Sequence, residues 1–414
     1  MGVTEGSGSQ GPVHQGGRWS VRTRQVLEFL EAWERRCSTH PSEPSLSLKE
    51  FARRFPQMGS RDRKEWSLGI YQAWRARRVL GKAASWEECL IAGLVAVLGQ
   101  DAPWVLWLKQ CCQHHEEVVS AMELRGHEGF PLAQGVSSRL NREVFFREQG
   151  RAGSAWLRVR ASRTRELADY FVRKDWTYRV MEPVHPSSVP WALPLGLPLQ
   201  ECPGLEGGWF ELQDLSCQQL LSWMPPKPHG RWLDACAGSG GKTLLMHDAW
   251  PELQWFVTDL RESALQELSK RFARVGWKQY SRACVDWISQ EPGGLGSFPD
   301  RFEGVLLDAP CSGSGSWRNQ PQAQLRAESA GPEVHASQQE QLLRRLWTKV
   351  REQGYLLYVT CSVYALENED RIQGFLAENS QAQLLRDGYL DASEQGGDVL
   401  YAALLQKAGS SSQA

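Results

Sequence analysis

Two cysteines follow short apolar runs in the second half of the chain. Residues 304–307 lead into Asp308 and, after a proline, Cys311, whereas residues 355–359 lead into a Thr-Cys-Ser triplet centred on Cys361. A thiolate is a strong nucleophile, so Cys311 by itself has the position of an attacking residue at the end of a buried strand. A single cysteine at a strand end is more often a small core residue. Two cysteines that converge in one crevice favour covalent chemistry.

A glycine-rich loop precedes both cysteines. Residues 234–243 read Asp-Ala-Cys-Ala-Gly-Ser-Gly-Gly-Lys-Thr and follow an apolar run. Glycines let the backbone approach a ligand closely, and the N–H groups at the start of the next helix can bind it. We expect this loop to bind a nucleotide-like cofactor through Cys236, Ala237, Gly238, Ser239, Gly240, Gly241 and Lys242.

Two kinds of nucleotide site fit this loop. A P-loop requires Gly-x-x-x-x-Gly-Lys-Ser/Thr, and Cys236 stands where the first glycine belongs. The adenosylmethionine loop of class I methyltransferases requires an acidic residue at the end of the second strand for the ribose hydroxyls, and Asp259 stands there. Asp286 ends the third strand and is expected beside the adenine. A P-loop nucleotide hydrolase remains an alternative, because residues 305–308 would also pass as the acidic strand of such an enzyme.

The elements that must position these residues alternate regularly from residue 231 onward. Helical stretches, such as residues 262–275 and 337–351, separate most of the apolar runs. This alternation predicts a doubly wound, mostly parallel sheet, in which ligands bind beyond the carboxyl ends of the strands. The expected strands are residues 231–234, 255–258, 283–285, 304–307, 355–359 and, as an antiparallel addition, 399–405.

The first half of the chain has a different character. Residues 1–19 are rich in Gly, Ser and Gln and are expected to be disordered. Apolar residues at three- and four-residue spacing predict an all-α bundle over residues 20–130. Residues 139–228 are expected to form a small α+β domain, with strands at 155–160 and 176–180 and a basic helix between them. Arginines at the exposed positions of this sheet would suit the phosphate backbone of RNA.

Charge is distributed unevenly along the chain. The formal net charge is −1, yet residues 22–82 hold fourteen Lys or Arg against seven Asp or Glu, and residues 139–174 hold ten against four. We therefore expect nucleic acid to bind at these basic segments. The ten cysteines include no Cys-x-x-Cys pair, and no apolar run reaches the ~18 residues of a membrane span. These features predict a cytoplasmic protein with reduced thiols, no metal and no membrane partner.

Three motifs fall in order and give the chain a specific resemblance. They are the loop at 234–243, Asp-Ala-Pro-Cys-Ser-Gly-Ser-Gly from Asp308, and Thr-Cys-Ser from Thr360 with Glu-Asn-Glu following. The chain thereby resembles the RsmB-like (Nop/NSUN) RNA cytosine-5 methyltransferases over most of residues 139–407. The resemblance implies an α/β fold, with a Rossmann-like class I methyltransferase domain at residues 229–408. A small α+β RNA-binding domain and an all-α NusB-like RNA-binding bundle would precede it.

The resemblance also implies a mechanism and partners. S-adenosyl-L-methionine would be the cofactor, with Asp308 among its contacts, and RNA the substrate of a monomeric enzyme. Ribosomal RNA is favoured over transfer RNA because of the NusB-like bundle. The Cys361 thiolate would add to carbon 6 of a cytosine, Asp308 would hydrogen-bond the base, and Cys311 would assist the release of Cys361. Cys311 thus becomes the releasing residue, and Cys361 the attacking one.

The chain departs from the family pattern at a few positions. Asn319 stands where the second of two arginines is usual, Arg160 where asparagine is common, and Gly238-Ser239 where Ala-Pro is common. The departure at Asn319 concerns the contacts of its loop with RNA, and the effect of Asn319 and Arg160 on RNA specificity is left open. The alternatives to ribosomal RNA methylation are methylation of transfer RNA, nucleotide hydrolysis by a P-loop, and a catalytically silent RNA-binding assembly factor.

Overall fold

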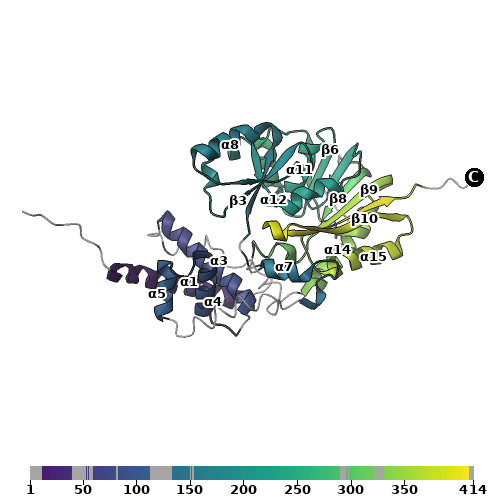
Figure 1. Cartoon of the computed structure of the whole chain (residues 1–414). Coiled ribbons are helices and arrows are strands. Elements are labelled where there is room, and N and C mark those ends of the chain that lie inside the picture. Colours follow the sequence, from purple (N-terminus) through teal and green to yellow (C-terminus); the bar gives the residue numbers. More distant parts are fainter. Residues whose placement is uncertain are drawn as a thin grey trace, which may run out of the picture. The chain divides into compact units, whose positions relative to one another are not determined.

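The computed structural model shows two compact units in the chain (Figure 1). The first comprises residues 1–131 with 320–329, and the second residues 132–319 with 330–414. The residues whose structure is described are 12–39, 59–80, 83–111, 133–149, 153–289, 298–320 and 331–409, with 53, 55, 151, 295, 296 and 323.

Helices packed on an aromatic core form the described part of the first unit. Residues at helical spacing on successive helices, such as Phe29, Trp66 and Trp104, are almost completely buried. Ser85 and Glu88 form a reciprocal capping box, which stabilises the start of one helix. The helices are α1 (Pro12–Thr39), α3 (Ser60–Leu80), α4 (Trp86–Leu98) and α5 (Pro103–Cys111).

Two expectations for this unit need adjustment. Helix α1 begins at Pro12, so residues 12–19 are helical although they were expected in a disordered tail; proline at a first helical position favours such a start. Arginines of the unit also form ion pairs within it, for example Arg18 with Glu65 at 2.5 Å and Arg77 with Glu34 at 2.8 Å. The positive charge that favours nucleic acid is therefore partly neutralised inside the unit.

A small antiparallel sheet opens the second unit. Its strand order is β2-β3-β1-β4, and helix α8 (Thr164–Arg173) covers one face by packing Leu167 and Phe171 on Leu157 and Val159. Only residues 179 and 180 of the expected strand at 176–180 pair with a neighbour. The strand beside β1 comes instead from a proline-rich segment. The strands are β1 (Ala155–Arg160), β2 (Arg179–Val180), β3 (Ser188–Leu193) and β4 (Phe210–Leu212).

The expectation that arginines lie on an exposed face of this sheet holds for Arg179 of β2, which is exposed, but is wrong for β1. Arg158 is completely buried, and Arg160 is only partly exposed. Both side chains reach Asp248, at the end of a helix on the larger sheet. Because that face of β1 packs against the rest of the unit, its arginines serve internal ion pairs.

The larger sheet has the order β10-β11-β9-β8-β5-β6-β7. Strands β5 to β9 are parallel to one another, whereas β11 is antiparallel to β9 and to β10. The mostly parallel, Rossmann-like sheet is confirmed, and β10 is a strand that the sequence pattern did not reveal. The strands are β5 (Arg231–Asp234), β6 (Gln254–Asp259), β7 (Tyr280–Cys284), β8 (Phe302–Asp308), β9 (Val350–Thr360), β10 (Ala382–Asp391) and β11 (Val399–Lys407).

Alternating side chains build one core on each face of this sheet. Trp232 and Leu306 face helices α11 (Gly241–Ala249) and α12 (Glu262–Arg274). Leu233 and Val305 face helices α14 (Gly331–Trp347) and α15 (Glu369–Glu378). Burial on both faces explains why these strands read as continuous apolar runs. Shorter helices of the unit are α7 (Arg142–Gln149), α9 (Pro203–Glu206) and α10 (Leu215–Gln219).

Candidate active site

Cys311 and Cys361 lie together at the carboxyl ends of neighbouring parallel strands. In the register of β8 and β9, Asp308 is beside Val359, so both chains enter the same crevice as their strands end. The two Sγ atoms are 3.3 Å apart, although the residues are 50 positions apart in sequence. Both side chains are partly exposed. A small substrate in the crevice can therefore reach both sulfurs.

The contact between the sulfurs separates their ionisation. A hydrogen bond from Cys311 lowers the pKa of Cys361 in spite of burial, and the charge of Lys242 acts in the same direction. The same contact, together with burial, raises the pKa of Cys311 well above its usual range. The thiolate is thus favoured at Cys361 and the thiol at Cys311. Because the thiolate is the reactive form, this asymmetry suits attack by Cys361.

Lys242 connects the glycine-rich loop with the strand-end aspartate. Its Nζ donates to Asp308 Oδ2 at 2.6 Å, and both side chains are largely shielded from solvent. Burial alone would lower the pKa of Lys242, but the Asp308 carboxylate more than compensates and raises it. The ammonium therefore stays charged beside the cysteines. Lys242 was expected as a cofactor contact, and its position also ties it to Asp308 and the two cysteines.

The glycine-rich loop forms a concave backbone surface at the start of α11. Gly240 has a φ of 78°, and a Cβ there would lie 2.7 Å from Phe272, so the position requires glycine. At Gly238 a Cβ would meet Arg261 at 3.9 Å, which leaves space beside the loop. Gly238 N–H donates to Asp259 Oδ2 at 2.8 Å. The Asp259 carboxylate thus lies against the loop at the start of α11.

The other expected loop residues have more structural surroundings. Cys236 packs into the core on one face of the sheet, and burial raises the pKa of its thiol well above the usual range. Ala237 packs into the core on the other face, and its N–H donates to Thr258 O. Ser239 accepts hydrogen bonds from Arg271 at its carbonyl and hydroxyl oxygens. These contacts fix the conformation of the loop.

Asp286 is separate from the residues described so far. It follows strand β7, the edge strand beside β6, and its exposed carboxylate accepts from Ile288 N–H in its own turn. Asp234, which opens the loop motif, is buried and accepts from Thr243 Oγ1 at 2.5 Å. Burial raises the pKa of Asp234 to about 7. Asp286 can reach a ligand from the edge, whereas Asp234 supports the loop from inside.

A polar network between the two sheets was missing from the sequence interpretation. Arg158 Nε donates to Gln213 Oε1 at 2.7 Å, and Gln213 Nε2 donates to Gly241 O at 3.0 Å. Glu211 pairs with Arg274 of α12 at 2.8 Å. The small sheet therefore holds the helices that border the glycine-rich loop. The alternation of arginines along β1 was visible in the sequence, but the sequence did not show that they face the rest of the unit.

The segment after Cys311 also points inward. Arg318 is buried and pairs with Glu148 of α7 at 3.1 Å. Asn319 Nδ2 donates to Asp398 Oδ1 at 2.8 Å. Both side chains are therefore bonded within the unit.

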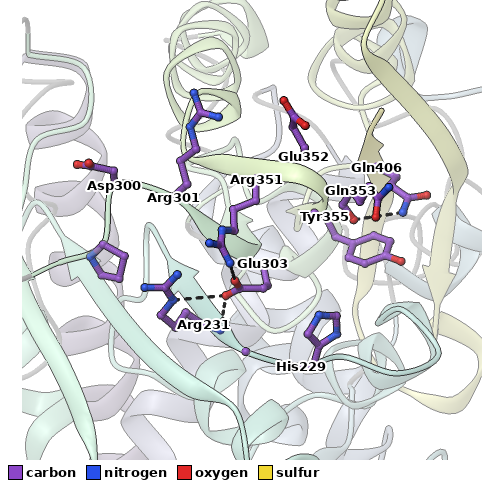
Figure 2. A pocket seen from close by; sticks show the side chains of 13 residues that line it. His229, Arg231, Asp300, Arg301, Glu303, Arg351, Glu352, Gln353, Tyr355 and Gln406 are labelled. Atoms are coloured by element: carbon purple, nitrogen blue, oxygen red, sulfur yellow. Dashed lines mark hydrogen bonds and ion pairs between the residues drawn. The ribbon is translucent and has the colours of Figure 1, made fainter. Parts of the chain in front are cut away.

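An open cavity of about 990 Å³ lies at the opposite end of the parallel strands, where β8 and β9 begin (Figure 2). Glu303 in this cavity accepts from Arg231 N–H at 2.7 Å and pairs with Arg351 (Figure 2). None of the expected site residues lines it. Within the described residues, no group of three or more His, Cys, Asp or Glu is arranged to hold a metal ion. No described helix has the length and apolar character needed to cross a membrane.

Comparison with known proteins matches the part of the chain that carries this site. Residues 221–403 match the family model described as 16S rRNA methyltransferase RsmB/F. The ribosomal RNA small subunit methyltransferase B of Xylella fastidiosa is 34% identical over 291 residues, which are 64% of this chain and 63% of the relative. The protein of the same name from Escherichia coli is 33% identical over 224 residues, 51% of this chain and 50% of the relative. The chain thus spans half to under two thirds of these relatives.

The fold has relatives among solved structures. The crystal structure of PH0851 aligns with this chain with a TM-score of 0.65. The alignment covers 87% of this chain and 93% of the PH0851 chain. The sequence identity is 17%, so this likeness concerns the fold alone.

Proposed function

Because the chain belongs to the RsmB-like (Nop/NSUN) family, we propose that it transfers a methyl group from S-adenosylmethionine to carbon 5 of a cytosine in RNA. The observation that carries the proposal is the Cys311–Cys361 pair, with sulfurs 3.3 Å apart beside Asp308 and Lys242. A P-loop hydrolase does not require two cysteines at the strand ends. The position of Lys242 on Asp308 also gives the lysine a task other than binding a phosphate chain.

The residues of the glycine-rich loop fit adenosylmethionine. The N–H groups at the start of α11, with the space beside Gly238, suit a carboxylate. The Asp259 carboxylate suits ribose hydroxyls. Asp259 would hold the ribose, and Asp286 would lie beside the adenine. When bound, this cofactor supplies an electrophilic methyl group. Lys242 and Asp308 lie between the loop and the cysteines and would border the reacting atoms.

The cysteines divide the covalent chemistry between them. The Cys361 thiolate adds to carbon 6 of the cytosine, and the electron pair of the 5,6 double bond becomes available at carbon 5 for bonding to the methyl group. Asp308 hydrogen-bonds the base and stabilises the charge on its ring. Elimination then releases the carbon 5 proton to solvent and returns the electrons of the C–S bond to Cys361. The Cys311 S–H lies within 3.3 Å and can donate to the departing thiolate.

Ribosomal RNA of the small subunit is the proposed substrate. The matched relatives are named for that RNA, and a cytosine must leave its base stack to enter a crevice of this kind. The all-α unit is proposed as a NusB-like RNA-binding domain and the small sheet with α8 as a second RNA-binding surface. Transfer RNA is the alternative substrate for the same reaction, and both RNAs should be compared in the methylation assay.

Three matched cysteine variants test this function. Cys361→Ala is expected to abolish incorporation of tritiated methyl groups into unmodified small-subunit RNA, with cofactor binding unchanged in calorimetry. Cys311→Ala is expected to accumulate a covalent protein–RNA adduct, seen as a shifted band on a denaturing gel. Cys284→Ala is the control, because this exposed cysteine also ends a parallel strand but lies on β7.

The outcomes separate the alternatives. Methylation by the Cys361→Ala variant contradicts its assignment as nucleophile. Tight RNA binding without methyl incorporation by the unmodified chain supports a catalytically silent assembly factor. A calorimetric titration that detects binding of ATP and no binding of adenosylmethionine supports a nucleotide hydrolase.

A further inference from the structure

One buried carboxylate joins the two loops that carry the cysteines. Glu367, in the short helical turn after β9, is completely buried. Its Oε1 accepts from Ser312 N–H at 2.9 Å, and its Oε2 accepts from Ser312 Oγ at 2.6 Å and from Ser362 Oγ. Ser312 directly follows Cys311, and Ser362 directly follows Cys361. The same carboxylate therefore fixes the neighbour of each sulfur.

Further hydrogen bonds close this connection. Ser314 Oγ lies 3.2 Å from Ser362 Oγ and accepts from Val363 N–H at 2.9 Å. Gly315 N–H donates to Cys361 O at 2.8 Å, and a Cβ at Gly315 would collide with Val399 O. Only glycine permits this approach. The two loops thus pack as one body around the carboxylate.

A glutamine of α14 completes the set of donors. Gln339 is completely buried, and its Nε2 donates to Glu367 Oε1 at 3.2 Å and to Pro310 O at 2.9 Å. Four donors on one buried carboxylate are more than a structural turn requires, and each of them leads to a residue beside a cysteine or to the loop that precedes it. Such an arrangement favours a single geometry for the reactive groups.

We propose that Glu367 is a positioning residue, which holds the two cysteine loops together in the geometry in which Cys311 contacts Cys361. Its role in methylation rests on the function proposed above. The charged and titratable groups around Cys361 are Cys311, Asp308, Lys242, Glu367 and Asp398. Around Cys311 they are Cys361 and Glu367, with Tyr358 nearby. Among these, Glu367 alone is hydrogen-bonded to residues of both loops in the described part of the chain.

Removal of the carboxylate acts on the two cysteines through the geometry of their loops. The contact between the sulfurs, which lowers the pKa of Cys361, depends on that geometry. The negative charge of Glu367 raises the pKa of both cysteines and so does not by itself separate them. Glu367→Gln replaces a carboxylate that accepts from both loops by an amide, and it loosens the contact between the sulfurs. The preference for a thiolate at Cys361 over Cys311 must therefore decrease.

Alkylation of the protein alone measures this preference. Limiting iodoacetamide, followed by mass spectrometry of the two cysteine peptides, gives the ratio of Cys361 to Cys311 modification. The ratio is expected to fall about tenfold in Glu367→Gln, corresponding to about one pKa unit of lost separation. Ser362→Ala, which removes one hydroxyl donor, should lower the ratio less and keeps the test available if the first variant does not fold.

Glu369→Gln is the matched control. Glu369 lies two residues away and is also largely buried, but its carboxylate is hydrogen-bonded to Ser137 and Tyr389 and not to the cysteine loops. Its variant should keep the alkylation ratio. In methylation assays Glu367→Gln should lower kcat at least about tenfold with KM for adenosylmethionine unchanged. An unchanged alkylation ratio in folded Glu367→Gln overturns the proposal, whereas a changed ratio in a protein without methyltransferase activity overturns only the proposed function.

Discussion

Lys242 Nζ lies 2.6 Å from Asp308 Oδ2, and the same ammonium contributes to the lowered pKa of Cys361. One side chain beside the glycine-rich loop thereby acts on the charge at the ends of both β8 and β9. The lysine is 66 residues from Asp308 in sequence. Only the parallel order of β5 and β8, which are neighbours in the sheet, brings them together.

Loss of this charge should slow the reaction and not merely weaken cofactor binding. In Lys242→Gln the pKa of Cys361 is expected to rise, because a cation that favours its thiolate is removed. Methyl transfer should fall about 100-fold, the usual effect of deleting one electrostatic contact at a reacting centre. The pH dependence of iodoacetamide alkylation at Cys361 checks the shift. Lys270→Gln, which removes an exposed lysine paired with Glu267, is the control and should leave both measurements unchanged.

The small sheet should influence the cofactor through Arg158. This completely buried arginine contacts Gln213 and Asp248, and Gln213 in turn holds Gly241 at the start of α11. Arg158→Met leaves Asp248 with one arginine partner, and loss of one member of a buried ion pair commonly costs about 3–5 kcal/mol. We expect a lower melting temperature and an adenosylmethionine Kd about tenfold higher, with RNA affinity changed less. An equal loss of affinity for RNA and cofactor contradicts this separation.

Much of the architecture follows from the sequence, and the failures have a common physical cause. Strands β5 and β8 sit where apolar runs end in aspartate, since burial on both faces leaves a continuous signal. Strand β10 alternates between partly buried and exposed residues at the edge of the sheet, so its signal is weak. The direction of Arg158 and the partners of Glu367 depend on residues distant in sequence. Periodicity shows that a side chain lies on one face, but not what covers that face.

RNA contacts of the small sheet are therefore expected on α8 rather than on β1. Arg165, Arg173 and Lys174 are exposed on or next to this helix, in contrast to the buried Arg158. Replacement of all three by alanine should weaken RNA binding similarly for different sequences. The slope of log affinity against log salt should decrease by about 0.7 for each phosphate of single-stranded RNA that the variant no longer neutralises. Filter binding at several salt concentrations measures the slope, and unchanged adenosylmethionine affinity shows that the fold is intact.

Asp234 gives the second unit a specific pH dependence. Burial raises its pKa to about 7 in the folded protein, against about 3.9 in an unfolded chain. The folded state therefore binds the proton more tightly, and this contribution to stability is complete below about pH 4 and is lost as the pH rises through about 7. The free energy of opening should decrease over this interval by up to about 1.4 kcal/mol per pH unit.

Asp234→Asn removes this dependence while keeping an acceptor for the Thr243 hydroxyl, which donates to Asp234 Oδ2. Relative to the unmodified chain, the variant should gain stability steadily between about pH 5 and 7, because only the aspartate must ionise in the core. Hydrogen exchange of the β5 and β8 amides measures the local free energy of opening at each pH. Asp286→Asn, at an exposed carboxylate, controls for the loss of one negative charge. A stability difference that is constant across this pH range contradicts the raised pKa of Asp234.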